Sequence, residues 1–110
     1  MARFIQVVTT TDSRELAERI ARSLVGDRLA ACVQIDGPMT SIYHWRGKME
    51  EAEEWRLTAK SRAVFFDDIA AAIRRVHSYE VPEIIATEII WGDETYLRWL
   101  EEETRPGVRK

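Results

Sequence analysis

Apolar and β-branched residues come in short runs along this chain, and the spacing within each run predicts an element. Residues 4–10 are almost continuously apolar or β-branched, which is typical of a strand buried on both faces. Asp12, with Glu15 three residues later, is a candidate N-cap for a helix that ends at Gly26. The inward face of this helix is formed by Leu16, Ala17, Ile20, Ala21, Leu24 and Val25.

The next segments alternate between apolar and polar positions, as strands with one buried face do. Residues 29–36 and 40–45 are rich in strand-forming residues, and Gly37-Pro38 between them predicts a break or bulge. The turn signal Arg46-Gly47-Lys48 leads into a further alternating run at residues 55–60. Residues 30–61 are therefore expected to form one long hairpin.

The second half of the chain predicts two more helices and a fourth strand. Ser61 is a candidate cap for a helix that runs to His77, with an inward face of Phe65, Ile69, Ala72, Ile73 and Val76. Pro82 disfavours helical dihedrals at the preceding residue, so the run IIATEII at residues 84–90 is interpreted as a buried strand. Asp93 is expected to cap a short last helix.

The predicted order is βαββαβ followed by a short C-terminal helix. In a single domain this order indicates an α+β fold with an antiparallel sheet and both main helices on one face, the ferredoxin-like split βαβ arrangement. Residues 1–104 are expected to form this one domain, and residues 105–110 a flexible C-terminal tail.

Composition and charge limit the classes of partner. The formal charge of −3 comes from well-mixed acidic and basic residues, which argues against a nucleic-acid surface and against a basic membrane-binding stripe. The chain contains no apolar run long enough to span a bilayer, and residues 1–8 lack a signal-peptide pattern. We therefore expect a cytoplasmic protein, and the single Cys32 fits a reducing compartment.

Two features predict assembly with further copies of the chain. A long hairpin would leave unpaired strand edges on a monomer, and such edges favour pairing with another chain. The chain also has more large indole rings than a core of 110 residues readily buries. These rings belong to Trp45, Trp55, Trp91 and Trp99.

Candidate ligand chemistry is concentrated between residues 77 and 84, in the segment HSYEVPEI. His77 is either a metal ligand or a cap for the last carbonyls of its helix. Glu80 and Glu83 either contact a cation or accept backbone N–H bonds that hold the loop. Tyr79 is either a packing residue or a ligand contact. Cys32 is either a ligand for a soft metal ion or a small buried apolar residue.

Three segments together resemble the CutA divalent-cation tolerance family. They are LAACVQI at residues 29–35, SIYHWRGKMEE at residues 41–51, and HSYEVPEI at residues 77–84. The resemblance implies a ferredoxin-like subunit in a homotrimer that takes part in tolerance to copper and other divalent metal ions. The candidate metal ligands are then His77, Cys32 and Glu80. Candidates for a ligand or inter-subunit cleft are Trp45, Tyr79 and Glu83.

Metal tolerance is not the only function that the sequence allows. A trimeric binding or signalling module of the PII kind, without direct metal chemistry, is the alternative, and the analogy rests on the fold alone. The acidic run at residues 50–54 is interpreted as a solvated edge. The chain has no glycine-rich phosphate loop, no HExxH motif and no GxSxG motif, so we do not expect an enzyme.

Overall fold

The computed structural model describes residues 2–104, so the tail expected at residues 105–110 lies outside the described residues. The predicted order of elements is confirmed. The elements are β1 (Phe4–Thr11), α1 (Arg14–Gly26), β2 (Cys32–Trp45), β3 (Lys48–Arg62), a 3-10 turn (Ala63–Phe65), α2 (Phe66–Val76), β4 (Ile85–Ile89) and α3 (Glu94–Glu103).

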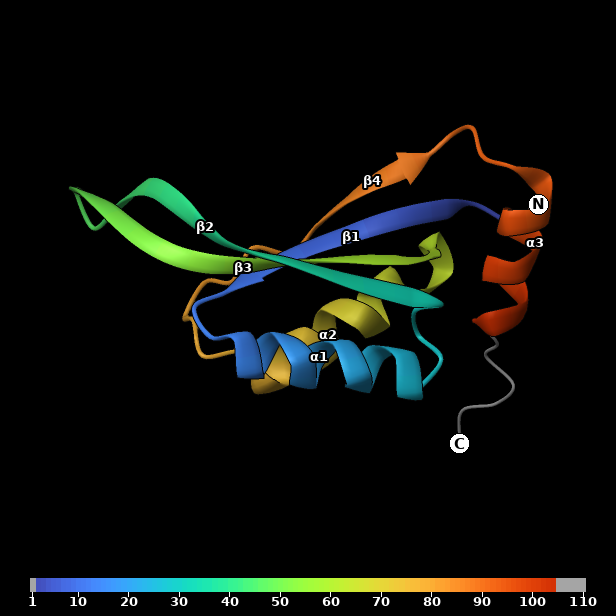
Figure 1. The fold of residues 1–110 in the computed structure, drawn as a ribbon, viewed down its shortest axis with the longest axis horizontal. Helices are drawn as coiled ribbons and strands as arrows, with labels where there is room; N and C mark the ends of the chain where they lie inside the picture. Colours follow the sequence, from blue (N-terminus) through green and yellow to red (C-terminus); the bar gives the residue numbers. More distant parts are fainter. Residues whose placement is uncertain (1, 105–110) are drawn as a thin grey trace.

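The described strands form one antiparallel sheet in the order β2-β3-β1-β4. Helices α1 and α2 lie side by side on one face of this sheet, while α3 stands at one end of it (Figure 1). This is the split βαβ arrangement expected from the sequence. The α+β class and the antiparallel sheet are therefore confirmed.

The core lies between the sheet and the two helices, and it corrects the expectation for β1. Burial alternates along this strand: Ile5, Val7 and Thr9 are buried, whereas Phe4 and Val8 are only half-buried. The strand thus has one fully buried face instead of two. Its buried face packs with the fully buried residues Ala17, Ile20 and Leu24 of α1 and Ile69 and Ile73 of α2.

Two helix starts differ from the sequence-based prediction. Ser13, not Asp12, is the N-cap of α1: its backbone is extended and its hydroxyl accepts the Leu16 N–H at 3.1 Å. Ser61 does not cap a helix. It lies in β3, is fully buried, and donates its hydroxyl to the carbonyl of Leu29. The expected cap at Asp93 is confirmed, since its carboxylate accepts the Tyr96 N–H at 3.1 Å.

The hairpin of β2 and β3 is confirmed and extends well beyond α1 and α2 (Figure 1). Its two-residue turn has positive φ at Arg46 (52°) and Gly47 (81°), the geometry that matches the twist of paired strands. The register shifts between Asp36 and Met39, which is the expected irregularity at Gly37-Pro38.

Strand β4 is not buried, contrary to its apolar sequence. It pairs only with β1, at one edge of the described sheet, and four of its five residues are exposed. Ile85 is 52% exposed, and the following Ile90 and Trp91 are 74% and 87% exposed. The valines expected on the inner helix faces, Val25 and Val76, are also exposed. As an edge strand, β4 lacks a second neighbouring strand whose side chains would flank its own.

Gly37 allows β2 to pass close to β3, and we predict that a side chain at position 37 destabilises the fold. A Cβ at Gly37 would lie 2.9 Å from the Glu54 carbonyl oxygen, and its φ is +144°. We expect Gly37→Ala to lower the free energy of unfolding by about 1–3 kcal/mol. Chemical denaturation at one fixed protein concentration measures the change.

Gly26→Ala is the matched control for this prediction. A Cβ at Gly26 would meet no atom within 4 Å, so this variant should be neutral or more stable by up to about 1 kcal/mol. Equal effects of the two substitutions would contradict the close approach at Gly37.

Candidate functional site

The site lies at the end of β1, where the hairpin of β2 and β3 extends beyond its pairing with β1. The last pair between β1 and β3 joins Thr11 to Trp55, and the loop from α2 to β4 crosses the end of β1 there (Figure 1). The hairpin and the loop enclose a cleft of about 570 Å³, a volume that suits a small organic ligand. Its lining residues are Thr10, Ser41, Ile42, Tyr43, Trp45, Glu54, Ser78, Tyr79, Glu80, Val81 and Glu83.

Glu54 is the buried acid of this cleft. Its exposed fraction is 7%, and its two carboxylate oxygens each accept a hydroxyl, from Ser41 and from Tyr79, both at 2.6 Å. Removing a carboxylate from water is costly unless strong hydrogen bonds replace the lost solvation. The two hydroxyls supply these bonds and hold the carboxylate in one orientation between the hairpin and the loop.

Tyr79 stays protonated and acts as a donor. Burial of its ring raises the pKa of Tyr79 well above the ordinary tyrosine value, and the hydrogen bond to Glu54 and the charge of that carboxylate raise the pKa further. The phenol therefore remains a hydrogen-bond donor to Glu54 throughout the physiological range of pH.

His77 attaches the loop to the end of β1. Its Nδ1 accepts the backbone N–H of Tyr79 at 3.0 Å, so Nε2 carries the proton and donates it to the Thr10 carbonyl at 2.8 Å. Of the two roles that the sequence leaves open for His77, the side-chain helix cap is not formed, and the metal-ligand role stays a prediction. Only its backbone N–H bonds back to the helix, at Ile73. A metal ion at His77 would have to displace one of the two side-chain bonds.

The three candidate metal ligands do not meet within one chain. Cys32 lies on β2, where it pairs with Lys60 of β3, and Asp36 is four residues further along β2. Asp36 and Thr10 lie in one row of the sheet, because both pair with Arg56. The four-residue offset along β2 corresponds to about 13 Å. Glu80 forms an ion pair with Arg46 at 2.9 Å. Over residues 2–104 no group of three or more His, Cys, Asp or Glu side chains is arranged to hold a metal ion.

The three residues expected at a ligand cleft lie on the wall of the same cleft. Trp45 comes from the end of β2, whereas Tyr79 and Glu83 come from the loop after α2. Tyr79 packs its ring beside that of His77, with 4.7 Å between the ring centres. The hairpin and the loop thus converge, although Trp45 and Tyr79 are 34 residues apart in the sequence.

Sequence reasoning missed Glu54 and Ser41. Glu54 belongs to the acidic run at residues 50–54, which was interpreted as a solvated edge, and most of that run is indeed exposed. Its burial depends on Tyr79, 25 residues further along the chain, so no local pattern marks it. The one nearby signal is Trp55, a large ring at the point where β3 enters the core.

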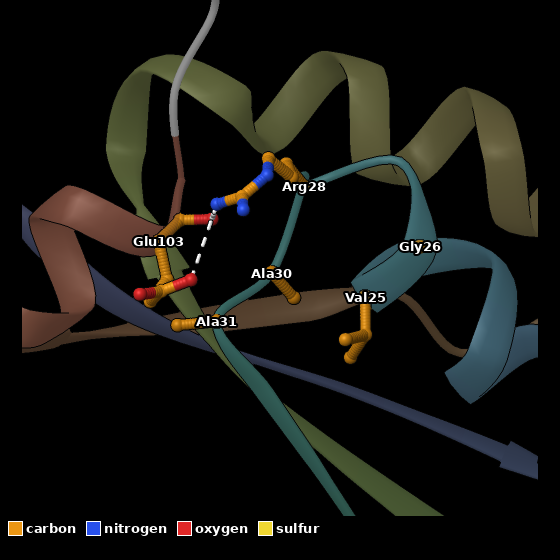
Figure 2. A pocket seen from close by; sticks show the side chains of 6 residues that line it. All are labelled: Val25, Gly26, Arg28, Ala30, Ala31 and Glu103. Atoms are coloured by element: carbon orange, nitrogen blue, oxygen red, sulfur yellow. Dashed lines mark hydrogen bonds and ion pairs between the residues drawn. The ribbon is translucent and has the colours of Figure 1, made fainter. Parts of the chain in front are cut away.

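A second, smaller hollow of about 240 Å³ lies between the end of α1, residues 28–31 that lead into β2, and α3 (Figure 2). Arg28 spans it, donating Nη1 to the Glu103 carbonyl at 3.2 Å and to the Glu103 carboxylate at 3.1 Å. A cation at the C-terminal end of a helix is favourable because the last carbonyls there lack partners. Arg28 therefore has a structural role in docking α3.

Together these features define a ferredoxin-like α+β domain with a polar cleft at the base of a long hairpin. A family model described as CutA1 divalent ion tolerance protein matches residues 5–103. Since that match covers most of the chain, the chain belongs to the CutA1 divalent ion tolerance family.

Individual relatives agree with this assignment. The chain is 43% identical over 98 residues to the divalent-cation tolerance protein CutA of Thermus thermophilus, a match that covers 89% of this chain and 95% of that protein. It is 38% identical over 101 residues to the chloroplastic protein CutA of Arabidopsis thaliana, covering 92% of this chain but only 56% of the relative. The crystal structure of CutA1 from Oryza sativa superposes with a TM-score of 0.92 at 36% identity, covering 94% of this chain and 95% of that one.

Localisation stays a prediction. Each helix within residues 2–104 is too short or too polar to cross a membrane. The Arabidopsis relative is named as chloroplastic, so family membership does not assign one compartment.

The bond from Tyr79 to Glu54 yields a stability prediction. We expect Tyr79→Phe to lower the free energy of unfolding by about 1–3 kcal/mol, because the buried carboxylate loses one of its two donors. Tyr43→Phe is the matched control: among residues 2–104 the Tyr43 hydroxyl has no hydrogen-bond partner, and the expected change is within about 0.5 kcal/mol. Denaturant titration of both variants measures the difference, and equal losses would contradict the bond.

The raised pKa of Tyr79 yields a prediction about alkaline pH. A tyrosine whose pKa is higher in the folded state stabilises the protein fully below the unfolded pKa, near 10, and loses that contribution as pH rises through the folded value. When phenolate absorbance of the folded protein is followed as pH rises, we therefore expect Tyr79→Phe to remove the component that titrates at the highest pH. If Tyr79→Phe instead removed a component that titrates near pH 10, Tyr79 would ionise like an exposed phenol.

Proposed function

We propose that this chain supports tolerance to divalent cations as a homotrimer, and that the cleft around Glu54 is the working site of the assembly. Family membership supports the physiological role, since the family model and the Thermus relative both carry divalent ion or cation tolerance in their descriptions. The role we propose is binding and not catalysis, because the sequence contains none of the common nucleophile or phosphate-loop motifs.

The buried carboxylate of Glu54 is the observation that carries the choice of site. An acid that is 7% exposed lowers stability unless it is compensated, and an apolar residue would pack at the same position at less cost. Glu54 nevertheless stands on the wall of the cleft, held by hydroxyls from two separate segments. Such an arrangement is typical of a group kept for binding.

The exposed apolar side chains support the homotrimer. The described sheet has free edges at β2 and β4, and exposed apolar side chains lie along both the hairpin and the β4 region. Contiguous exposed apolar surface marks interaction sites, and free edges favour pairing with another copy. Outside the cleft, the exposed apolar residues of these two regions are Met49, Ile85, Ile90 and Trp91.

Direct copper binding at His77, Cys32 and Glu80 is one form of this proposal, and a PII-like binding module is the other. The binding module is favoured because both His77 ring nitrogens are already hydrogen-bonded and Cys32 lies about 13 Å along the sheet from the row of the cleft. If the chain is a binding module, it supports cation tolerance by binding a ligand or partner in the cleft and not by binding the metal ion itself.

A growth assay tests the proposed function. In bacteria that lack their own CutA protein, we expect the wild-type chain to raise the copper concentration that permits growth. Glu54→Gln should lose at least half of that gain, because it removes the buried charge and leaves one acceptor oxygen where the carboxylate offers one each to Ser41 and Tyr79. Glu53→Gln, an exposed neighbour, is the control and should act as wild type. Equal growth with both variants would overturn the assignment of the cleft.

Native mass spectrometry of the same proteins separates assembly from copper binding. We expect a species of three times the chain mass, both alone and with copper chloride. Uptake of copper in multiples of three, lost in His77→Ala, would replace the binding module with direct metal handling. A monomer at micromolar concentration would overturn the homotrimer.

A further inference from the structure

The charge of the cleft selects the class of ligand. Three carboxylates line it, from Glu54, Glu80 and Glu83, and none of its described lining residues is Lys or Arg. The two partners of Glu54 are neutral hydroxyls, so its negative charge is not cancelled by them. A concave site with one sign of charge attracts the opposite sign and repels its own. Phosphates and other anionic metabolites are thus disfavoured, and cations are favoured.

Aromatic rings make an organic cation a better fit than a metal ion. Tyr43, Trp45 and Tyr79 line the cleft, and Trp45 and Tyr43 are 39% and 43% exposed. Ring faces attract ammonium and guanidinium groups but offer no ligand atoms to a metal ion. The volume of about 570 Å³ also exceeds what a single ion requires and suits a small organic molecule.

The rim of the cleft already holds one organic cation, the side chain of Arg46. Its guanidinium carbon lies 5.3 Å from the centre of the Trp45 ring, and its Nη2 lies 2.9 Å from Glu80 Oε1. Two residues that line the cleft thus bind a guanidinium through a ring face and a carboxylate. Arg46 and Glu80 are about 70% exposed, and ion pairs so exposed are weak, so a free ligand can compete with them.

We propose that the cleft binds a small organic cation that carries a guanidinium or primary ammonium group, and that Arg46 competes with this ligand for Trp45 and Glu80. This inference deepens the proposed function and rests on it only in taking the cleft as the working site. It assigns the recognising groups: Trp45 provides the ring face, and Glu80 and Glu83 provide acceptors for the N–H groups of the ligand.

Isothermal titration of the purified assembly with n-butylguanidinium chloride tests the proposal. We expect saturable binding that Glu80→Gln and Trp45→Leu each weaken about two- to five-fold, the range for a single ring or rim contact at an exposed site. Glu80→Gln keeps the side-chain shape, so it remains informative if Trp45→Leu fails to fold. Arg46→Ala should tighten binding, because it removes the internal competitor.

Arg14→Ala is the matched control. It also removes an arginine from an exposed ion pair, with Glu18 at 3.2 Å, but on α1 and outside the cleft. It should leave the affinity unchanged. Binding of n-butanol or of inorganic phosphate as tight as that of n-butylguanidinium would overturn the proposal, as would weaker binding in Arg46→Ala.

The outcome is separable from that of the growth assay. If n-butylguanidinium does not bind while Glu54→Gln still loses copper tolerance, the organic cation is overturned and the proposed function stands. If n-butylguanidinium binds as expected while Glu54→Gln keeps full tolerance, the ligand class stands and the link from the cleft to tolerance is overturned.

Discussion

The difference in length between β1 and the hairpin is the constraint on which the site depends. β1 pairs with β3 on one side and β4 on the other, and it ends at Thr11 opposite Trp55. Beyond that row, β3 no longer has β1 beside it. The loop after α2 lies next to this part of β3 instead. Because His77 bonds to the Thr10 carbonyl, the loop is held against the end of β1 and Tyr79 reaches the hairpin.

A buried charge then couples the three segments that meet there. Glu54 lies on β3, Ser41 on β2 and Tyr79 on the loop, and their hydrogen bonds replace the water that burial removes. Both the position of the loop and the shape of the cleft depend on these bonds. The raised pKa of Tyr79 belongs to the same arrangement, because burial and the Glu54 charge both disfavour a phenolate.

A single chain leaves many of its large apolar side chains exposed outside its core. Helices α1 and α2 cover one face of the sheet (Figure 1), while β4 and the far half of the hairpin keep exposed aliphatic and aromatic side chains. The apolar sequence of β4 predicts a buried strand, because the side-chain pattern indicates that burial is favourable but not which chain provides it. In the proposed homotrimer, neighbouring copies cover the exposed apolar side chains that lie outside the cleft.

The sequence by itself determined the order of elements, the hairpin turn at Arg46-Gly47, the irregularity at Gly37-Pro38 and the segment containing Tyr79. These features depend on periodicity and backbone preference, which act within a few residues. Only the tertiary structure decided that Glu54 is buried, that the His77 side chain binds Thr10 and that β4 is an exposed edge. Burial and side-chain pairing depend on residues distant in the chain, and no local pattern records them.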